Sequence, residues 1–220
     1  MIIEIIGPAG AGKSTLSKAL AERFEHVRLE TPPSFRRGSD IPFFIRNSFS
    51  LLPFLSRIYL HKNGRYPSWE QFISMEMLNG WHQVLNQKAH QEDMIFVLDQ
   101  GPVYMLTILT LFGPERIRPN NLKKWWDRAF HRWAETLDLV IWLDTSLPEL
   151  VDRIRAREIW HGVKDKGDVA AYQYLESYRQ AYESVIARLI TCSDQLKVVR
   201  VDTGQSTLEE TVKKSSLSFI

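Results

Sequence analysis

Short apolar runs of strand length alternate with longer amphipathic stretches along the chain. The apolar runs cover residues 2–6, 27–30, 94–98, 139–143 and 197–201. In the stretches between most of them, apolar residues recur at three- and four-residue spacing, which is the period of a helix with one buried face. Strands that alternate with helices predict an α/β fold. We therefore expect a five-stranded parallel sheet flanked by helices on both faces.

Residues 31–92 do not follow this alternation. Pro42, Pro53 and Pro67 lie within the segment and are expected to divide it into separate helical pieces. Aromatic side chains are frequent throughout it, and most such side chains serve core packing, although some could stack on a flat ligand ring. We interpret the segment as a helical excursion above the sheet, within a single domain that spans residues 1–220.

Three helix starts can be identified from capping sequences, in which a serine is followed three residues later by Glu or Gln. Ser68 with Gln71 marks the start of a helix in the excursion, Ser146 with Glu149 that of the helix after Asp144, and Ser206 with Glu209 that of the last helix. In such a pair the two side chains satisfy backbone N–H groups that the first helical turn leaves unpaired. We therefore expect helices to begin at all three positions.

The segment from Gly7 to Ser14 reads G-P-A-G-A-G-K-S and matches the nucleotide-binding pattern G-x-x-x-x-G-K-[ST] at every specified position. It follows an apolar run and precedes a helical pattern, which is the context that this motif requires. Backbone N–H groups can surround the phosphates, Lys13 can reach the β- and γ-phosphates, and Ser14 can ligate Mg²⁺. We therefore expect ATP and Mg²⁺ to bind here. The expected nucleotide contacts in this loop are Gly7, Ala9, Gly10, Ala11, Gly12, Lys13, Ser14 and Thr15.

Asp99 ends an apolar run and is the candidate for the second Mg²⁺ ligand, directly or through water. Its alternative role is to cap the helix that begins after Gly101. Asp144 ends another run, and we interpret it as a structural residue at the start of the next helix. Gln100 follows Asp99, where many hydrolysing P-loop ATPases have a glutamate. This favours phosphoryl transfer over hydrolysis, although a glutamine can orient water in some NTPases.

Arg153 and Arg157 lie four residues apart near the end of a predicted helix, so they share one face. A polar segment with two glycines and no helical periodicity follows them. Arginines on a flexible segment can cover the transferred phosphoryl group and exclude water. We expect residues 153–168 to form such a lid, with both arginines in contact with the nucleotide. The alternative is a solvated helix face on which Glu149 pairs with Arg153.

The composition, with 44% hydrophobic and 25% charged residues, is that of a globular protein. A net charge of +2 is too small for a protein that coats nucleic acid, and the basic run at 123–128 fits the solvated back of a buried helix. A single cysteine excludes an internal disulfide framework, and we find no signal peptide and no apolar run of membrane-spanning length. We therefore expect a cytoplasmic protein without nucleic-acid or membrane partners. Whether it forms a homodimer is a question that the sequence leaves open.

Several features occur together in the order found in one enzyme group. The P-loop is followed by the strand-terminal Glu30, by Asp99, by the segment RIRARE from Arg153 and by the segment YLESY from Tyr174. In this order the chain resembles the deoxynucleoside kinase and thymidylate kinase group of P-loop kinases. The helical excursion matches that group only in position and character. The resemblance implies ATP–Mg²⁺ as donor, a five-stranded parallel sheet and an arginine lid.

The resemblance also implies a catalytic base but leaves the acceptor open. A carboxylate at the position of Glu30 is the base beside the acceptor hydroxyl in these kinases; the alternative is a strand-end carboxylate that faces water. The acid at the position of Asp99 is usually followed by an acceptor-binding arginine, and Gln100 departs from this pattern. Arg36 and Arg37 could supply the missing charge, or they could form a solvated pair in a turn.

We therefore predict an ATP-dependent phosphotransferase that moves the γ-phosphoryl group to a small-molecule acceptor, with a nucleoside or related hydroxyl compound as the first choice. The predicted catalytic residues are Lys13, Glu30, Asp99, Arg153 and Arg157, with Ser14 and Asp99 at the metal. One alternative is a nucleoside monophosphate kinase, and another is a P-loop ATPase or nucleotide switch that acts on a protein partner. A lid and an aromatic-rich excursion fit a closed small-molecule site better than a switch.

Overall fold

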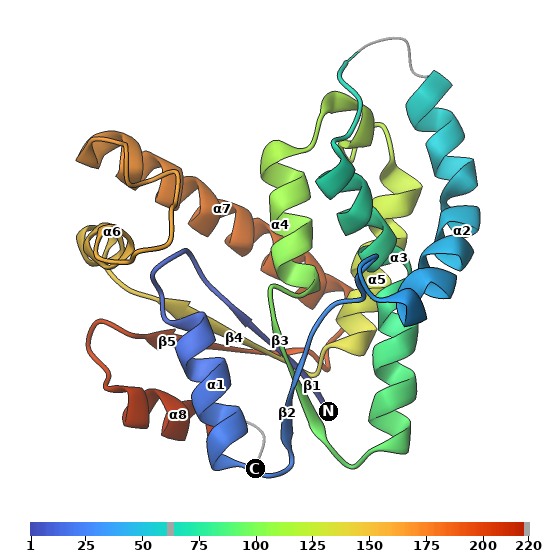
Figure 1. Ribbon diagram of the computed structural model, residues 1–220. Coiled ribbons are helices and arrows are strands. Elements are labelled where there is room, and N and C mark those ends of the chain that lie inside the picture. The colour runs from blue at the N-terminus through green and yellow to red at the C-terminus, as the bar shows by residue number, and fades with distance from the viewer. Residues whose placement is uncertain (61–63, 218–220) are drawn as a thin grey trace.

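The computed structural model describes residues 1–60 and 64–217, and this part of the chain is built around one five-stranded sheet (Figure 1). Every pair of neighbouring strands is parallel, and the strand order is β2-β3-β1-β4-β5. The strands are β1 (Ile2–Ile6), β2 (Val27–Glu30), β3 (Ile95–Asp99), β4 (Leu139–Asp144) and β5 (Lys197–Asp202). The predicted α/β fold is confirmed.

The central strand β1 is buried along its whole length because it has a strand on each side and helices on both faces. Ile5 lies opposite Asp99 of β3 and Ile141 of β4. Glu30 at the end of β2 lies opposite Leu98 of β3. Since parallel strands end at the same edge, the register brings the P-loop and the acidic strand ends to one edge of the sheet, where ligands bind in such folds.

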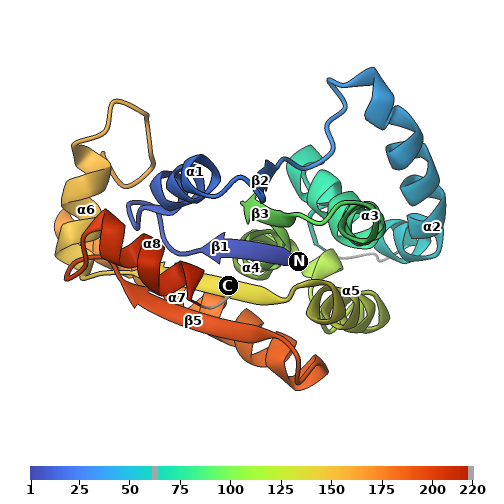
Figure 2. The same cartoon turned by 90° about the horizontal axis from the view of Figure 1, so that it is seen from below.

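Helices cover both faces of the sheet (Figure 2). The helices that share a core with Ile3 and Ile5 of β1 are α1 (Lys13–Arg23), α6 (Leu147–Arg155) and α8 (Leu208–Ser216). Those that share a core with Ile2 and Ile6 are α4 (Pro102–Phe112), α5 (Lys123–Thr136), most of α7 (Asp168–Cys192) and the helices of the excursion. Two short 3₁₀ helices, η1 (Gly38–Asp40) and η2 (Glu115–Ile117), lie in connections. The division follows from the alternation of side chains along a strand.

The excursion is helical, as predicted, and forms α2 (Ile41–Leu60) and α3 (Trp69–Gln91), which pack against each other. Pro67 lies between α2 and α3, as expected, but the expectation that Pro42 and Pro53 also divide the segment is wrong, because α2 continues through both. Pro42 lies in the first turn, where its missing N–H has no helical partner to lose. Pro53 has no N–H group, so the carbonyl group of Phe49 lacks its helical donor. Both residues lie on the exposed side of the helix, where water can bond that carbonyl group.

Two of the three predicted helix caps, Ser68 and Ser146, are confirmed, and the third is displaced by one residue. Ser68 Oγ accepts the Gln71 N–H (3.3 Å), and Gln71 Oε1 accepts the Ser68 N–H (2.9 Å). In the last helix, Thr207 and not Ser206 is the cap, and it exchanges the equivalent bonds with Glu210. Two adjacent pairs of residues there have the same spacing, so the sequence pattern alone could not distinguish them.

A buried carboxylate on β1 holds the N-terminus of α4. Glu4 is fully buried, and it accepts the backbone N–H groups of Val103 (2.8 Å) and Tyr104 (3.0 Å). Both belong to the first turn of α4, where N–H groups lack intrahelical partners. A Cβ atom on Gly101 would lie 2.9 Å from Glu4 Oε2, so this position requires glycine. The contact thereby fixes the turn that follows Asp99.

Burial raises the pKa of Glu4 to about 8, well above its ordinary value of 4.5. The folded protein then holds this proton over a pH range in which the unfolded chain has released it. Glu4 should therefore lower the free energy of unfolding as the pH rises from about 5 to about 8, by at most about 1.4 kcal/mol per pH unit. We expect Glu4→Gln to remove this contribution. Urea unfolding of both proteins across this range measures it, and a pH-independent difference between them would contradict it.

Candidate active site

The P-loop from Gly7 to Ser14 joins the end of β1 to the start of α1. Gly7, Gly10 and Gly12 have positive φ angles of 146°, 89° and 95°, which residues with a Cβ rarely adopt. A Cβ atom on Gly7 would also lie 2.2 Å from the carbonyl oxygen of Leu143 on β4. These backbone angles allow the loop to turn its N–H groups toward a phosphate at the N-terminus of α1.

Lys13 is the first residue of α1, and its side chain is partly buried. Its Nζ donates to the carbonyl oxygens of Gly7 (2.8 Å) and Pro8 (3.0 Å). Burial lowers the pKa of Lys13 to about 8; the negative charge of Asp99 opposes this shift, and the positive charge of Arg157 adds to it. A polyphosphate could replace the two carbonyl groups, and its charge would favour the protonated ammonium group.

The two predicted metal ligands lie in contact. Ser14 Oγ donates a hydrogen bond to Asp99 Oδ2 (2.8 Å), although the two residues come from different elements. Asp99 Oδ1 is buried and has no hydrogen-bond partner within the described residues. A buried carboxylate oxygen without a donor, beside a serine hydroxyl, suits a hard cation that prefers oxygen ligands. The residues at this position therefore fit Mg²⁺.

Asp99→Asn should raise the Mg²⁺ concentration required for half-maximal use of ATP by about tenfold or more, because it removes a charged oxygen ligand. Asp144→Asn is the matched control. Asp144 also ends a strand, but its Oδ1 accepts from the guanidinium group of Arg179 (2.8 Å) and so serves the packing of α7. A magnesium titration of both variants measures the difference, and equal shifts would show that Asp99 is not the metal acid.

The predicted lid begins inside a helix. Arg153 lies in the last turn of α6, and non-helical turns occupy residues 156–167 before α7 begins. Arg153 donates to Glu149 Oε1 (2.6 Å), which is the ion pair considered above, and also to the carbonyl oxygen of Thr203 (3.0 Å). It therefore bridges α6 to the loop after β5. Arg157 lies just beyond α6, and both arginines line the same cavity.

This first cavity has a volume of about 460 Å³ and lies between the P-loop, the lid and the loop after β5. Its lining residues are Gly10, Ala11, Gly12, Thr15, Leu16, Leu143, Arg153, Ala156, Arg157, Thr203, Ser206, Leu208 and Thr211. Apolar and hydroxyl groups beside a phosphate-binding loop suit the base and ribose of a nucleotide. Sequence analysis missed Leu16, Leu143 and the last four of these residues. A signal was available, since Thr203 follows the last strand, and ligands bind beyond the carboxyl ends of strands.

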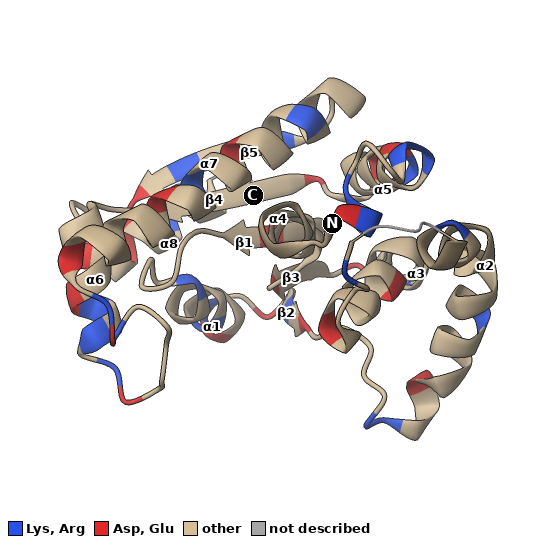
Figure 3. Ribbon diagram, turned by 90° about the horizontal axis from the view of Figure 1, so that it is seen from above, with Lys and Arg blue, Asp and Glu red and all other residues tan. Residues whose placement is uncertain are grey.

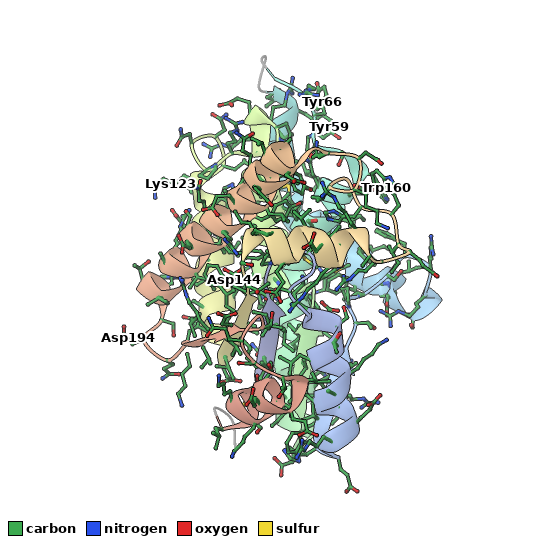
Figure 4. The ribbon with its side chains drawn as sticks, turned by 90° about the vertical axis from the view of Figure 1, so that its left-hand side faces the viewer. Tyr59, Tyr66, Lys123, Asp144, Trp160 and Asp194 are labelled. Carbon is green, nitrogen blue, oxygen red and sulfur yellow. The ribbon has the colours of Figure 1, made fainter. Side chains whose placement is uncertain are left out.

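A second cavity, of about 480 Å³, adjoins the P-loop and suits a triphosphate, because its lining includes Lys13, Ser14 and Arg157. Its lining residues are Gly10, Gly12, Lys13, Ser14, Thr15, Arg157, Glu158 and Ile159. The tip of the lid is largely exposed, with Trp160 at 74% exposure (Figure 4). An exposed tip leaves the lid free to move over a bound nucleotide.

A third cavity, of about 170 Å³, lies between the P-loop and α7, and Gly7, Ala9 and Lys13 form its P-loop side. Its lining residues are Gly7, Ala9, Lys13, Gln100, Tyr104, His161, Tyr174, Leu175, Tyr178 and Tyr182. Burial lowers the pKa of His161, and the nearby positive charges of Arg157 and Lys13 lower it further. We name this the tyrosine cavity. Sequence analysis missed its four tyrosines and His161, because the helical patterns of α4 and α7 do not reveal which turn faces the P-loop, and His161 lies in a segment without periodicity.

The predicted acceptor-side residues lie apart from these cavities. Glu30 lines none of the three, and its Oε1 accepts a hydrogen bond from Lys88 Nζ of α3 (2.6 Å). Arg37 pairs with Asp40 in its own loop (2.8 Å), and neither Arg36 nor Arg37 lines a cavity beside the P-loop. The structure thus brings together the P-loop, the metal-site acid and the lid arginines, while the position of the base stays a prediction.

A sequence model of one family, described as an AAA domain, matches residues 2–181. The chain belongs to the AAA domain family. The matched part of this AAA domain protein includes the P-loop, Asp99 and the whole lid, and it ends within α7. A search of curated proteins finds no match.

Solved kinase structures share the fold of this AAA domain protein. Deoxyadenosine kinase from M. mycoides with bound dATP matches with a TM-score of 0.51 and 17% identity, over 99% of this chain and 98% of the kinase. Thymidylate kinase from Candida albicans matches with a TM-score of 0.55 and 14% identity, over 98% and 89% of the respective chains. At such identities the likeness concerns the fold, which is the fold that the sequence resemblance implied.

Proposed function

We propose that this AAA domain protein transfers the γ-phosphoryl group of ATP to a hydroxyl group of a small uncharged acceptor, with a nucleoside as the first choice. The position of Lys13 carries the proposal, because Lys13 lines both the second cavity and the tyrosine cavity. A donor phosphate in one and an acceptor in the other would meet at its ammonium group. That charge would stabilise the phosphoryl group during transfer. Mg²⁺ bound by Ser14 and Asp99 would neutralise further phosphate charge.

The lining of the tyrosine cavity supports an uncharged acceptor. Among its described lining residues, Lys13 and His161 are the only basic side chains, and the lowered pKa of His161 favours neutral imidazole. An acceptor phosphate would need cations of its own, typically arginines. Tyrosine hydroxyls can instead both donate to and accept from the hydroxyl groups of an acceptor.

Gln100 supports the same acceptor class. It lines the tyrosine cavity where the resembling kinases usually have an acceptor-binding arginine, and an amide carries no charge. Its backbone has a positive φ of 64°, a region that non-glycine residues seldom occupy. Such conformations persist at functional sites when the surrounding structure enforces them. Here Glu4 fixes the turn that contains Gln100, because it accepts the N–H groups of the first turn of α4.

Incubation with ATP, Mg²⁺ and a panel of nucleosides, nucleoside monophosphates and sugars tests this function, with products detected by mass spectrometry. We expect phosphorylated product from a nucleoside or another neutral hydroxyl compound and none from monophosphates. Product from monophosphates alone would establish the nucleotide kinase alternative. Release of ADP without any phosphorylated acceptor would favour the ATPase or switch. Protein with Lys13→Ala controls for contaminating kinases.

A further inference from the structure

The outer face of α2 exposes a long apolar surface that lies outside the site described above. Its members, which we call the α2 stripe, are Ile41, Ile45, Phe49, Leu52, Tyr59 and Leu60. Phe49 is 68% exposed and Leu60 is 79% exposed. The spacing repeats along one side of a helix that is about 30 Å long. A contiguous apolar surface of this kind indicates contact with a partner or a membrane.

A shallow groove runs along the first half of the stripe. It has a volume of about 320 Å³, and Ser48 is the one polar residue in its lining. The other lining residues are Phe35, Ile41, Phe44, Ile45, Phe49, Leu52 and Leu55. The opposite side of α2 is already buried against α3, so this surface is not needed for the fold of the excursion.

The charges that α2 itself carries are all positive, although Asp40, which pairs with Arg37, directly precedes the helix. Over its 20 residues α2 contains Arg46 and Arg57 and no acidic residue. The two arginines are separated by eleven residues, or about three turns, so they lie along the same edge of the helix. Neither forms an ion pair within the described residues, and Arg46 donates to the neutral amide of Gln83 (2.6 Å). Figure 3 shows α2 at the rim of the molecule, away from the sheet.

The surrounding sequence has the same charge bias. Residues 31–69 contain six Lys and Arg residues and a single Asp, which gives a net charge of +5. The whole chain has a net charge of only +2, so the remaining residues are acidic overall, at −3. The positive charge is therefore concentrated in the segment that carries the exposed apolar surface.

We propose that the α2 stripe binds the surface of a membrane that contains anionic lipid. The apolar side chains would enter the boundary between headgroups and acyl chains, while Arg46 and Arg57 would reach lipid phosphates. Within the described residues no helix is long and apolar enough to cross a membrane. A helix that lies in the plane of the surface has no such requirement. The expectation of no membrane partner rested on the lack of an apolar run long enough to span a membrane. The exposure of the α2 stripe is a property of the fold and could not be deduced from the length of apolar runs.

A second copy of the chain is the alternative occupant of the stripe. A two-fold contact would place stripe against stripe, because symmetric dimers use the same surface on both subunits. Arg46 and Arg57 of both subunits would then enter an interface to which α2 contributes no acidic residue. Like charges placed together oppose association. Anionic lipid, in contrast, neutralises these arginines, and the charge pattern therefore favours the membrane.

Co-sedimentation of the full chain with lipid vesicles tests the proposal. We expect binding to vesicles of phosphatidylcholine mixed with phosphatidylglycerol, weaker binding in high salt, and little binding to phosphatidylcholine alone. Ile45→Ser combined with Phe49→Ser should lower the partition coefficient at least about tenfold, because it removes buried apolar area. Arg46→Gln combined with Arg57→Gln should lower binding to the anionic vesicles by about tenfold or more.

Matched controls separate the stripe from general surface effects. Val169→Ser with Ile190→Ser removes two exposed apolar side chains from α7, and Arg23→Gln with Lys124→Gln removes two exposed charges from α1 and α5. Absence of binding to anionic vesicles, or equal binding by stripe and control variants, would overturn the proposal. Sedimentation velocity without lipid covers the alternative. A wild-type dimer that the Ile45→Ser, Phe49→Ser variant converts to a monomer, without vesicle binding, would assign the stripe to a second copy.

Discussion

Lys13→Ala should lower kcat for phosphoryl transfer by about 10²–10³-fold or more, because it removes the cation shared by the donor and acceptor cavities. The protein should stay folded. The side chain of Lys13 is partly buried. Within the described residues, however, its ammonium group bonds only the loop carbonyls of Gly7 and Pro8, and burial already disfavours its charge. Thermal unfolding together with steady-state kinetics measures both effects.

Lys18→Ala, which removes an exposed lysine from the same helix, controls for a general loss of positive charge. It should leave the kinetics unchanged. In the free wild-type protein the Lys13 ammonium group loses its proton as the pH rises through about 8, so ATP affinity should fall in that range. The fall should be absent in Lys13→Ala. Turnover of Lys13→Ala within about tenfold of wild type would exclude the P-loop as the active site.

The fold could be predicted from the sequence because its strands are short, apolar and separated by helical periodicity. A buried parallel strand has no solvent face, so a run such as residues 139–143 needs no knowledge of its neighbours to be recognised. The course of α2 could not be predicted, because it depends on a balance between local and tertiary terms. Pro53 disfavours a continuous helix. The free energy gained by burying Phe44, Leu51 and Ile58 on the inner face of α2 outweighs the cost of the proline.

The same distinction applies to the site. The P-loop, Asp99 and the lid arginines are local motifs whose chemistry requires particular residues at fixed spacing, and the fold brings them together as expected. The tyrosine cavity has no such motif. Tyr104 comes from α4, His161 from the lid and Tyr178 from α7, so only the packing of three separate elements brings them together. Contributions of this kind depend on tertiary structure, which spacing along the chain does not report.

Glu30→Gln should lower kcat by about 10²–10⁴-fold with a hydroxyl acceptor, because such an acceptor carries a proton that must leave during transfer. Glutamine keeps the size and hydrogen bonding of glutamate and removes its basicity. The apparent affinity for ATP should change little. A phosphate acceptor needs no base and depends on cations. With that acceptor, Arg36→Gln combined with Arg37→Gln should be the more damaging change, and steady-state kinetics of both variants distinguishes the two acceptor types.

The ion pair with Lys88 offers a structural role for Glu30 as the alternative to catalysis, and Lys88→Gln separates the two roles. It breaks the pair (2.6 Å) but keeps the carboxylate, so a base at Glu30 should retain most of its activity in that variant. Equal losses in Lys88→Gln and Glu30→Gln, with equal losses of thermal stability, would make the pair structural. Glu92→Gln, which breaks the neighbouring pair with Arg28 (3.1 Å), controls for the loss of an acid on the same side of the sheet. Full activity of Glu30→Gln with a hydroxyl acceptor would show that another group acts as the base. Because Glu30 lines none of the three cavities, the next candidates would be the groups around the tyrosine cavity.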